Sequence, residues 1–192
     1  MHGSPVLAGG RMIFFKMDLV ALDAASGKEA WKTDLLKGQL KYGDLTHASP
    51  MAFRADGREF VFMYGHVVDA ATGRIVLEEQ AWKSGQDIAT PIVAGGTLYG
   101  VASSGQLHRA PLAQGTGALS LKDTATLKLF GRVQGAYTRG FVCASPLYHE
   151  GLLYVVDCMG SLYVVDDAAQ KLLYRKNLGV GLETGCKVHH MS

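Results

Sequence analysis

The stretch Leu19–Trp31, LVALDAASGKEAW, decides the fold of this chain. An apolar run leads into Asp23, a short turn ends at Gly27, and a second run ends at Trp31. Gly27 can adopt the positive φ that a tight turn needs, and the Asp23 carboxylate can accept hydrogen bonds from the residues that follow it. The stretch therefore predicts a β-hairpin.

The chain repeats this hairpin at His66–Leu77, HVVDAATGRIVL, and at Leu162–Tyr174, LYVVDDAAQKLLY. Each copy follows the same features, namely a Ser-Pro or Thr-Pro pair, a glycine turn, an apolar run and a second turn with glycine. The pairs are Ser4-Pro5, Ser49-Pro50, Thr90-Pro91 and Ser145-Pro146. The hairpin is thus the second half of a unit of about 47 residues that occurs four times.

The third unit departs from this pattern. Leu107–Pro111 stands where the aspartate hairpin is expected, and a loop rich in Gly, Ala and Thr follows it. We expect the outer strand of this unit at Thr126–Phe130.

A repeat of this length with four short strands predicts an all-β fold, a β-propeller of four-stranded antiparallel blades. One such sheet cannot cover both of its faces, but blades stacked around an axis cover one another. We expect a single domain over residues 1–192, with blades at approximately 4–48, 49–89, 90–144 and 145–191. No window shows the sustained 3.6-residue period of a helix.

The blade number has two interpretations. Ser192 stands in the register of a fifth blade start, as Ser145 does for the fourth. The chain could form a closed four-bladed ring, or it could be half of a ring of about seven or eight blades. We expect the larger ring, because neither end of the sequence carries a device that would close a ring.

Composition excludes several function classes. Of the 192 residues, 48% are hydrophobic and 19% are charged, so the chain can bury a core. A net charge of +2 is too small to indicate nucleic-acid binding. No apolar run is long enough for a membrane span, and no secretory signal is present. Three cysteines without paired spacing do not indicate a disulfide framework.

The first unit resembles the repeat of the PQQ-like, or quinoprotein-type, β-propellers. The family pattern is roughly A-x-D-x-x-T-G-K-x-x-W, preceded by S-P-V-V-x-x-G-x-V-Y-V, and Ala21-Leu22-Asp23, Gly27-Lys28-Glu29 and Trp31 match it. The second unit has Leu77 where tryptophan is expected, and the fourth has Gln170 for glycine.

In that family the Trp-ended strand docks one blade onto its neighbour, a role that suits a large apolar ring. The resemblance therefore implies a structural, blade-docking role for one set of residues. These residues are Asp23, Gly27, Trp31, Asp69, Gly73, Asp166 and Tyr174.

The resemblance leaves two functions open. Some family members are dehydrogenases that hold PQQ and calcium and oxidise alcohols or sugars, with a vicinal Cys-Cys pair near the quinone. Others bind no cofactor, among them the propeller lipoprotein of outer-membrane barrel assembly. This sequence has no Cys-Cys pair, no C-x-x-C-H haem motif and a single asparagine, Asn177.

We therefore expect a non-catalytic scaffold or binding module of a bacterial protein, periplasmic or extracellular by family resemblance, with no cofactor. Its partner would be a protein or peptide, or the remaining blades of a parent propeller, and open blade faces could lead to self-association. The alternative is part of a PQQ- and calcium-dependent alcohol or sugar dehydrogenase.

In propellers, the loops that enter the innermost strand face the central channel, and here those loops precede each Ser/Thr-Pro pair. Their polar and aromatic side chains are the candidates for a binding site. They are Tyr42, Asp44, His47, Asp87, Tyr137, Arg139, Glu183 and Lys187. Such a mixture would suit a polar ligand or a peptide, and the alternative is a set of solvated loop residues.

Cys186 and His189-His190 are residue types that bind metals. Histidine also occurs shortly before serine at His2 and His47, which favours a structural role in the repeat. We expect no metal site.

Overall fold

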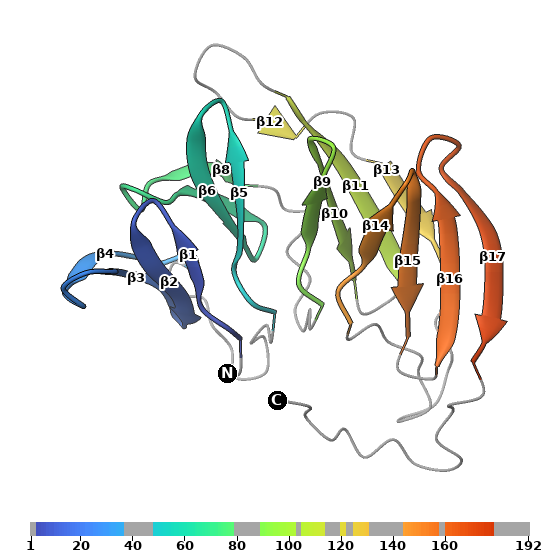
Figure 1. The fold of residues 1–192 in the computed structure, drawn as a ribbon, viewed down its shortest axis with the longest axis horizontal. Coiled ribbons are helices and arrows are strands. Elements are labelled where there is room, and N and C mark those ends of the chain that lie inside the picture. Colours follow the sequence, from blue (N-terminus) through green and yellow to red (C-terminus); the bar gives the residue numbers. More distant parts are fainter. Residues whose placement is uncertain are drawn as a thin grey trace.

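A computed structural model describes residues 3–36, 48–78, 89–102, 105–113, 120–121, 125–130, 144–157 and 160–178. These residues contain β-strands and no helix, and the strands form four antiparallel sheets in chain order. In Figure 1 the sheets fan around a common centre, with the first strand of each sheet innermost and β4 and β17 at the two outer sides. This arrangement confirms the all-β propeller fold with four blades.

The first two sheets are simple meanders in which each strand pairs with the next. The first contains β1 (Val6–Ala8), β2 (Arg11–Lys16), β3 (Asp18–Asp23) and β4 (Glu29–Thr33). The second contains β5 (Met51–Ala55), β6 (Arg58–Met63), β7 (His66–Asp69) and β8 (Ile75–Glu78). The hairpins predicted around Asp23 and Asp69 are therefore the two outer strands of each sheet.

The third sheet has five strands instead of the predicted four. It contains β9 (Ile92–Ala94), β10 (Thr97–Val101), β11 (Gln106–Ala113), β12 (Ser120–Leu121) and β13 (Ala125–Lys128). Strand β11 is eight residues long, so its first half pairs with β13 and its last two residues pair with β12. The outer strand expected at Thr126–Phe130 is β13, shifted slightly toward the N-terminus.

The fourth sheet returns to the regular pattern. It contains β14 (Leu147–His149), β15 (Leu152–Val156), β16 (Ser161–Asp166) and β17 (Lys171–Asn177). The hairpin predicted at Leu162–Tyr174 is the β16–β17 pair. In the described part of the chain, no helix has the length and apolar character needed to cross a membrane.

A bulge at the same place marks the repeat in three sheets. The pairing of the two outer strands shifts between Ala21 and Leu22 in the first sheet, between Val67 and Val68 in the second, and between Val164 and Val165 in the fourth. Each bulge lies directly before the aspartate that begins the outer turn. A bulge increases the local twist of a sheet, so these three blades gain extra twist at the same place in the repeat.

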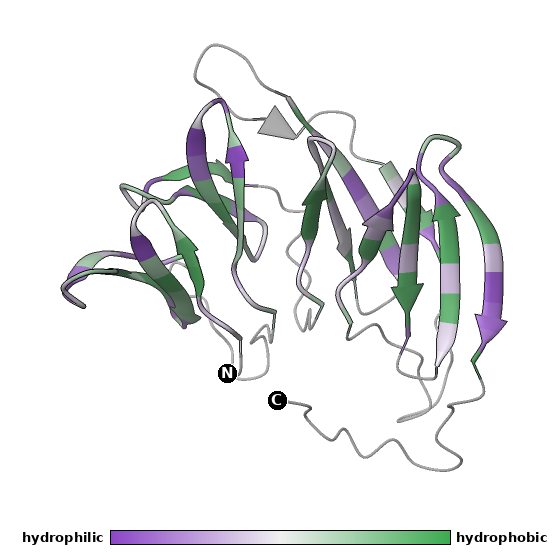
Figure 2. Ribbon diagram, in the orientation of Figure 1, coloured by the Kyte–Doolittle hydropathy of each residue, from purple (hydrophilic) through white to green (hydrophobic). Residues whose placement is uncertain are grey.

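The core lies between the sheets, because successive residues of a strand point to opposite faces. In β6, Val61 and Met63 pack with the first sheet, and Phe60 and Phe62 pack with the third. The central strands are accordingly rich in apolar residues on both faces, and Figure 2 shows β15 and β16 as largely green with paler bands. Each interior blade thus contributes to two separate apolar clusters.

Candidate functional site

All eight channel-loop candidates lie outside the described residues. These are Tyr42, Asp44, His47, Asp87, Tyr137, Arg139, Glu183 and Lys187. The three cysteines and the histidines at positions 2, 189 and 190 also lie outside them. The prediction of a channel-facing site stays a prediction.

The residues that directly follow two of these loops are described, and they link the blades. The backbone N–H of Ser4 donates to the Ser49 Oγ at 2.7 Å, and the backbone N–H of Ser49 donates to the Thr90 Oγ1 at 3.0 Å. The hydroxyls of Ser49 and Thr90, each directly before a proline, therefore accept a hydrogen bond from the preceding blade. The recurrence of Ser or Thr before Pro is the sequence signal for this link.

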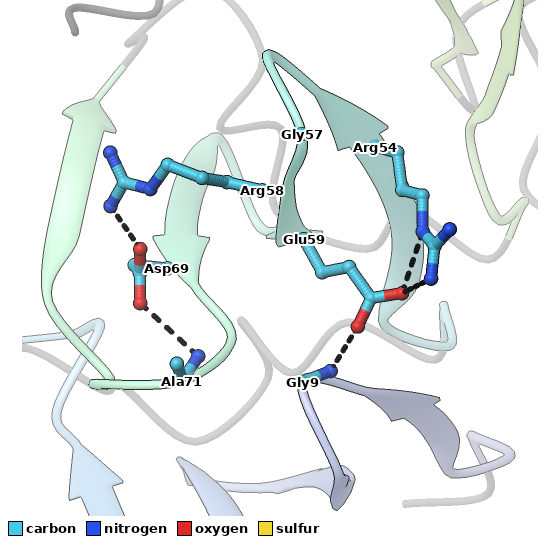
Figure 3. A pocket seen from close by; sticks show the side chains of 7 residues that line it. All are labelled: Gly9, Arg54, Gly57, Arg58, Glu59, Asp69 and Ala71. Carbon is cyan, nitrogen blue, oxygen red and sulfur yellow. Dashed lines mark hydrogen bonds and ion pairs between the residues drawn. The ribbon is translucent and has the colours of Figure 1, made fainter.

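A polar pocket of about 310 Å³ lies at the other end of the innermost strands, where the first and second sheets meet (Figure 3). Its walls are the β1–β2, β5–β6 and β7–β8 turns and the strands beside them. It is lined by Gly9, Arg54, Gly57, Arg58, Glu59, Asp69 and Ala71. Of these residues, sequence analysis had singled out only Asp69, and for a structural role.

Glu59 connects the two blades across this pocket. One of its carboxylate oxygens accepts the backbone N–H of Gly9, and the other accepts from the Arg54 guanidinium, with Nε at 2.8 Å and Nη2 at 2.7 Å. Hydrogen bonds from the Gly9 N–H and from the Arg54 guanidinium hold the pKa of Glu59 below its ordinary value. The ionised form of Glu59 is therefore the one that joins the blades.

Asp69 lies deeper, with 4% of its surface exposed. Burial raises the pKa of its carboxyl group, but hydrogen bonds from Thr72 and from the Arg58 guanidinium outweigh this effect and lower it. The Arg58 guanidinium also lies over the Phe60 ring, 5.2 Å from its centre. Both acidic groups of the pocket are thus ionised and paired with arginine near neutral pH.

The chemistry of the pocket is that of charge pairing and hydrogen bonding. Each guanidinium is held by a carboxylate, and the side chain of Arg54 remains 79% exposed. A carboxylate of a second molecule could therefore contact Arg54 from solvent. Within the described residues no cluster of three or more His, Cys, Asp or Glu could hold a metal ion.

A second polar junction joins the third and fourth sheets. The Asp167 carboxylate accepts from the Tyr99 hydroxyl and from the Arg109 Nε, both at 2.8 Å. Burial, together with this carboxylate, raises the pKa of Tyr99 to about 12. Sequence analysis missed all three residues, although the doubled Asp166-Asp167 in the fourth hairpin was a departure from the repeat that could have indicated them.

The structure places Trp31 against the next blade. Its indole N–H donates to the Ala70 backbone oxygen at 3.0 Å, and the Thr33 hydroxyl donates to the Gly73 backbone oxygen at 2.6 Å. A Cβ added at Gly73 would lie only 2.7 Å from the Trp31 ring. Glycine is therefore required here both for its φ of 74° and for the close approach of the indole.

The other hairpin residues shape their own turns. The Asp23 Oδ1 accepts from the backbone N–H and hydroxyl of Ser26 at 2.9 and 2.7 Å, and the Asp166 Oδ1 accepts from the Ala169 N–H at 2.9 Å. Gly27 has a φ of 70°, and Tyr174 is 47% exposed. A Cβ added at Gly27 would meet no described atom within 4 Å.

Comparison with solved structures shows the same fold in two kinds of protein. BamB from Moraxella catarrhalis superposes with a TM-score of 0.58 at 17% identity, covering 90% of this chain and 47% of that chain. The quinohemoprotein alcohol dehydrogenase ADHIIG from Pseudomonas putida HK5 gives a TM-score of 0.60 at 15% identity, covering 92% and 34%. The corresponding enzyme from Comamonas testosteroni gives 0.59 at 15%, with the same coverage.

This chain therefore spans between a third and a half of the length of these structures. No curated protein sequence matches it significantly. The family model described as outer membrane protein assembly factor BamB matches residues 16–138, which is more than half of the chain. Together with the four-bladed repeat, this match shows that the chain belongs to the PQQ-like β-propeller family of that assembly factor.

Proposed function

We propose that the chain is a non-catalytic β-propeller scaffold that binds other polypeptides outside the cytoplasm of a bacterium. The observation that carries the proposal is the family match over residues 16–138, whose description is an outer membrane protein assembly factor. An assembly factor acts by holding other chains, and an outer membrane lies beyond the cytoplasm.

The described polar groups support a scaffold. Glu59 links the first two blades, Asp167 links the last two, and Ser49 links the second to both of its neighbours. These contacts fix the blades relative to one another, which is what a rigid binding platform needs. Arg54 offers an exposed guanidinium beside the pocket for a carboxylate of the bound chain.

A second candidate function is part of a PQQ- and calcium-dependent dehydrogenase of alcohols or sugars. The likeness to two quinohemoprotein alcohol dehydrogenases, with TM-scores of 0.60 and 0.59, favours it at the level of the fold. The channel-loop carboxylates that could hold calcium lie outside the described residues, and Asn177 lies exposed at the end of β17. Fold likeness alone does not select a chemistry.

Two measurements test the proposal. Titration with PQQ and Ca²⁺, followed by absorbance and by dye reduction with ethanol and glucose, should give neither stoichiometric binding nor turnover. Turnover would establish the dehydrogenase instead. For the scaffold itself, the immobilised chain should bind a urea-unfolded outer-membrane β-barrel protein saturably, and a urea-unfolded soluble protein should bind much less. Equal binding of both would refute a role in outer-membrane assembly.

A further inference from the structure

The inner hairpin of the second blade, β5–β6, is longer than the corresponding hairpin of the other blades. In those three blades the first turn residue follows the proline of the Ser/Thr-Pro pair by four positions, namely Gly9, Gly95 and Glu150. In the second blade the corresponding residue, Asp56, follows Pro50 by six positions. The second blade therefore departs from the repeat at this turn.

Backbone hydrogen bonds show where the extra residues lie. In the first and fourth blades, the residue after the hairpin aspartate donates its N–H to the last residue of the inner turn, to the Gly10 and Gly151 oxygens. In the second blade, Ala70 donates instead to the Glu59 oxygen, two residues beyond Gly57. The hairpin thus projects past its neighbours by two residues on each strand, and in Figure 1 the β5–β6 turn rises above the β1–β2 and β9–β10 turns.

The projecting part, Arg54–Glu59, is here called the raised tip, and both neighbouring blades support it. Ala55 is 4% exposed and belongs to the same apolar cluster as Leu112 of the third sheet, and the Glu59 carboxylate accepts from Gly9 of the first. Leu112 lies near the end of β11, the eight-residue strand that is itself a departure from the repeat. In repeat proteins, additions of this kind gather on one face, which is often the binding face.

The raised tip presents its cations outward. The side chains of Arg54 and Arg58 are 79% and 44% exposed, whereas the carboxylates that they contact, Glu59 and Asp69, are 30% and 5% exposed. Figure 3 shows the two guanidinium groups on opposite sides of the hairpin. Asp56, in the turn itself, is the exposed acid of the tip.

A third cation belongs to the same blade edge. Arg74 is exposed directly after the β7–β8 turn, in which Thr72 donates to the Asp69 carboxylate that Arg58 also contacts. The formal charges of this region balance, but two of its three carboxylates lie behind guanidinium groups. A partner that approaches from solvent therefore meets mainly positive charge, which favours a partner of the opposite sign.

Arg54 also has hydrogen-bond donors to offer such a partner. A guanidinium carries five N–H donors, and Glu59 accepts one from Nε and one from Nη2, both on the same oxygen. A carboxylate matches the remaining donors best, because it can accept two parallel hydrogen bonds from one guanidinium. Since Glu59 holds the Arg54 guanidinium in place, little side-chain freedom is lost when a second carboxylate binds.

We propose that the raised tip is a docking site for an acidic segment of a partner polypeptide, with carboxylates of that segment on Arg54 at one side of the hairpin and on Arg58 at the other. The site lies at the opposite end of the innermost strands from the channel-loop candidates. The inference rests on the proposed function, since it names the chemistry of the chain that the scaffold holds.

The first test uses a fluorescein-labelled hexaglutamate peptide, with labelled hexaglutamine as the uncharged control. Fluorescence anisotropy with the full chain at pH 7 should show saturable binding of hexaglutamate alone, and binding should weaken severalfold as salt rises from about 20 to 150 mM. Absence of saturable binding up to about 1 mM protein would overturn the proposal. An oligothymidylate of equal charge that binds as tightly as the peptide would overturn the assignment to a polypeptide.

The second test locates the site with matched charge changes. Arg54→Gln should weaken hexaglutamate binding about threefold, because one exposed ion pair is lost. Lys16→Gln is the control, since Lys16 is exposed at the opposite end of β2 and its replacement removes the same charge. Equal weakening by both variants would show that only net charge matters, which would overturn the raised tip as the site.

Glu59→Gln separates binding from structure. It removes the carboxylate that competes for Arg54, so hexaglutamate should bind about threefold more tightly even though the link to Gly9 weakens and the chain becomes less stable. Unchanged or weaker binding, by a variant whose circular dichroism matches that of the wild type, would contradict the proposal.

Binding of the urea-unfolded outer-membrane β-barrel protein, measured in parallel, separates this inference from the proposed function. A chain that holds this protein but not hexaglutamate would overturn the acidic docking site alone. A chain that holds neither would overturn the proposed function as well.

Discussion

Replacement of Trp31 by alanine should destabilise the chain by about 3.5 kcal/mol, because the indole joins the first two blades. The ring lies directly on Gly73, and its N–H donates to the Ala70 backbone oxygen at 3.0 Å. From the same strand, the Thr33 hydroxyl donates to the Gly73 backbone oxygen of the second blade at 2.6 Å.

The magnitude follows from two contributions. The side chain is half-buried, so about 100 Å² of apolar surface at roughly 25 cal/mol/Å² gives about 2.5 kcal/mol. The lost hydrogen bond adds about 1 kcal/mol. Trp31→Phe keeps a ring over the glycine but loses the donor, so it should cost only about 1–1.5 kcal/mol.

Gly73→Ala provides a sharper test of the geometry. Its Cβ would lie 2.7 Å from the indole, and the φ of 74° is unfavourable for alanine by about 1–2 kcal/mol. In the double variant with Trp31→Ala the clash disappears and only the backbone cost remains. The two changes should therefore cost less together than the sum of the single changes, by more than about 0.5 kcal/mol.

Urea unfolding at one fixed protein concentration, followed by circular dichroism, measures these free energies, since any association makes stability depend on concentration. Strict additivity of Trp31→Ala and Gly73→Ala would refute the packing of the indole on the glycine. A cost below about 1 kcal/mol for Trp31→Ala would refute its role in holding the blades together.

Three further predictions concern the other blade junctions. Ser49→Ala should lower the free energy of unfolding by about 1 kcal/mol, since the Ser49 hydroxyl accepts a hydrogen bond from the first blade. Ser26→Ala, in an exposed turn, should lower it by less, and urea unfolding compares the two variants. The folded-state pKa of Asp69 lies below its ordinary value, so its carboxylate stabilises the fold above the unfolded-state pKa and loses this effect as pH falls through the folded-state pKa. Asp69→Asn should therefore flatten the fall in the free energy of unfolding below about pH 4. An unchanged acid profile would contradict this. Tyr99, with a pKa of about 12, stabilises the folded state below pH 10 and loses this effect as pH rises toward 12. Absorbance titration of the Asp167→Asn variant should show a lower pKa for this tyrosine. An unchanged pKa would exclude the Asp167 contact.

The hairpins and their repetition could be predicted because their determinants are local. Asp23 and Gly27 lie within one turn, and the carboxylate accepts from the backbone three residues later. The extra strand of the third sheet could not be predicted in this way. The length of β11 depends on two partners, β12 and β13, that come after a long loop.

The polar pocket could not be predicted from local sequence patterns either. Glu59 accepts from Gly9, fifty residues earlier, and no pattern around either residue indicates the other. The contact arises only when the β1–β2 turn of one blade meets β6 of the next. Residues that join blades are specified by the stacking of sheets, and sequence patterns within one sheet do not show them.

One position nevertheless recurs at the blade junctions. The residue after the hairpin aspartate is Ala70 in the second blade and Asp167 in the fourth, and both accept donors from the preceding blade: Ala70 from Trp31, and Asp167 from Tyr99 and Arg109. The first blade has Ala24 at this position, next to the open turn at Gly27. The acceptor at this position is a backbone oxygen at Ala70 and a carboxylate at Asp167, so the stacking of the blades reuses the place in the turn and not the residue type.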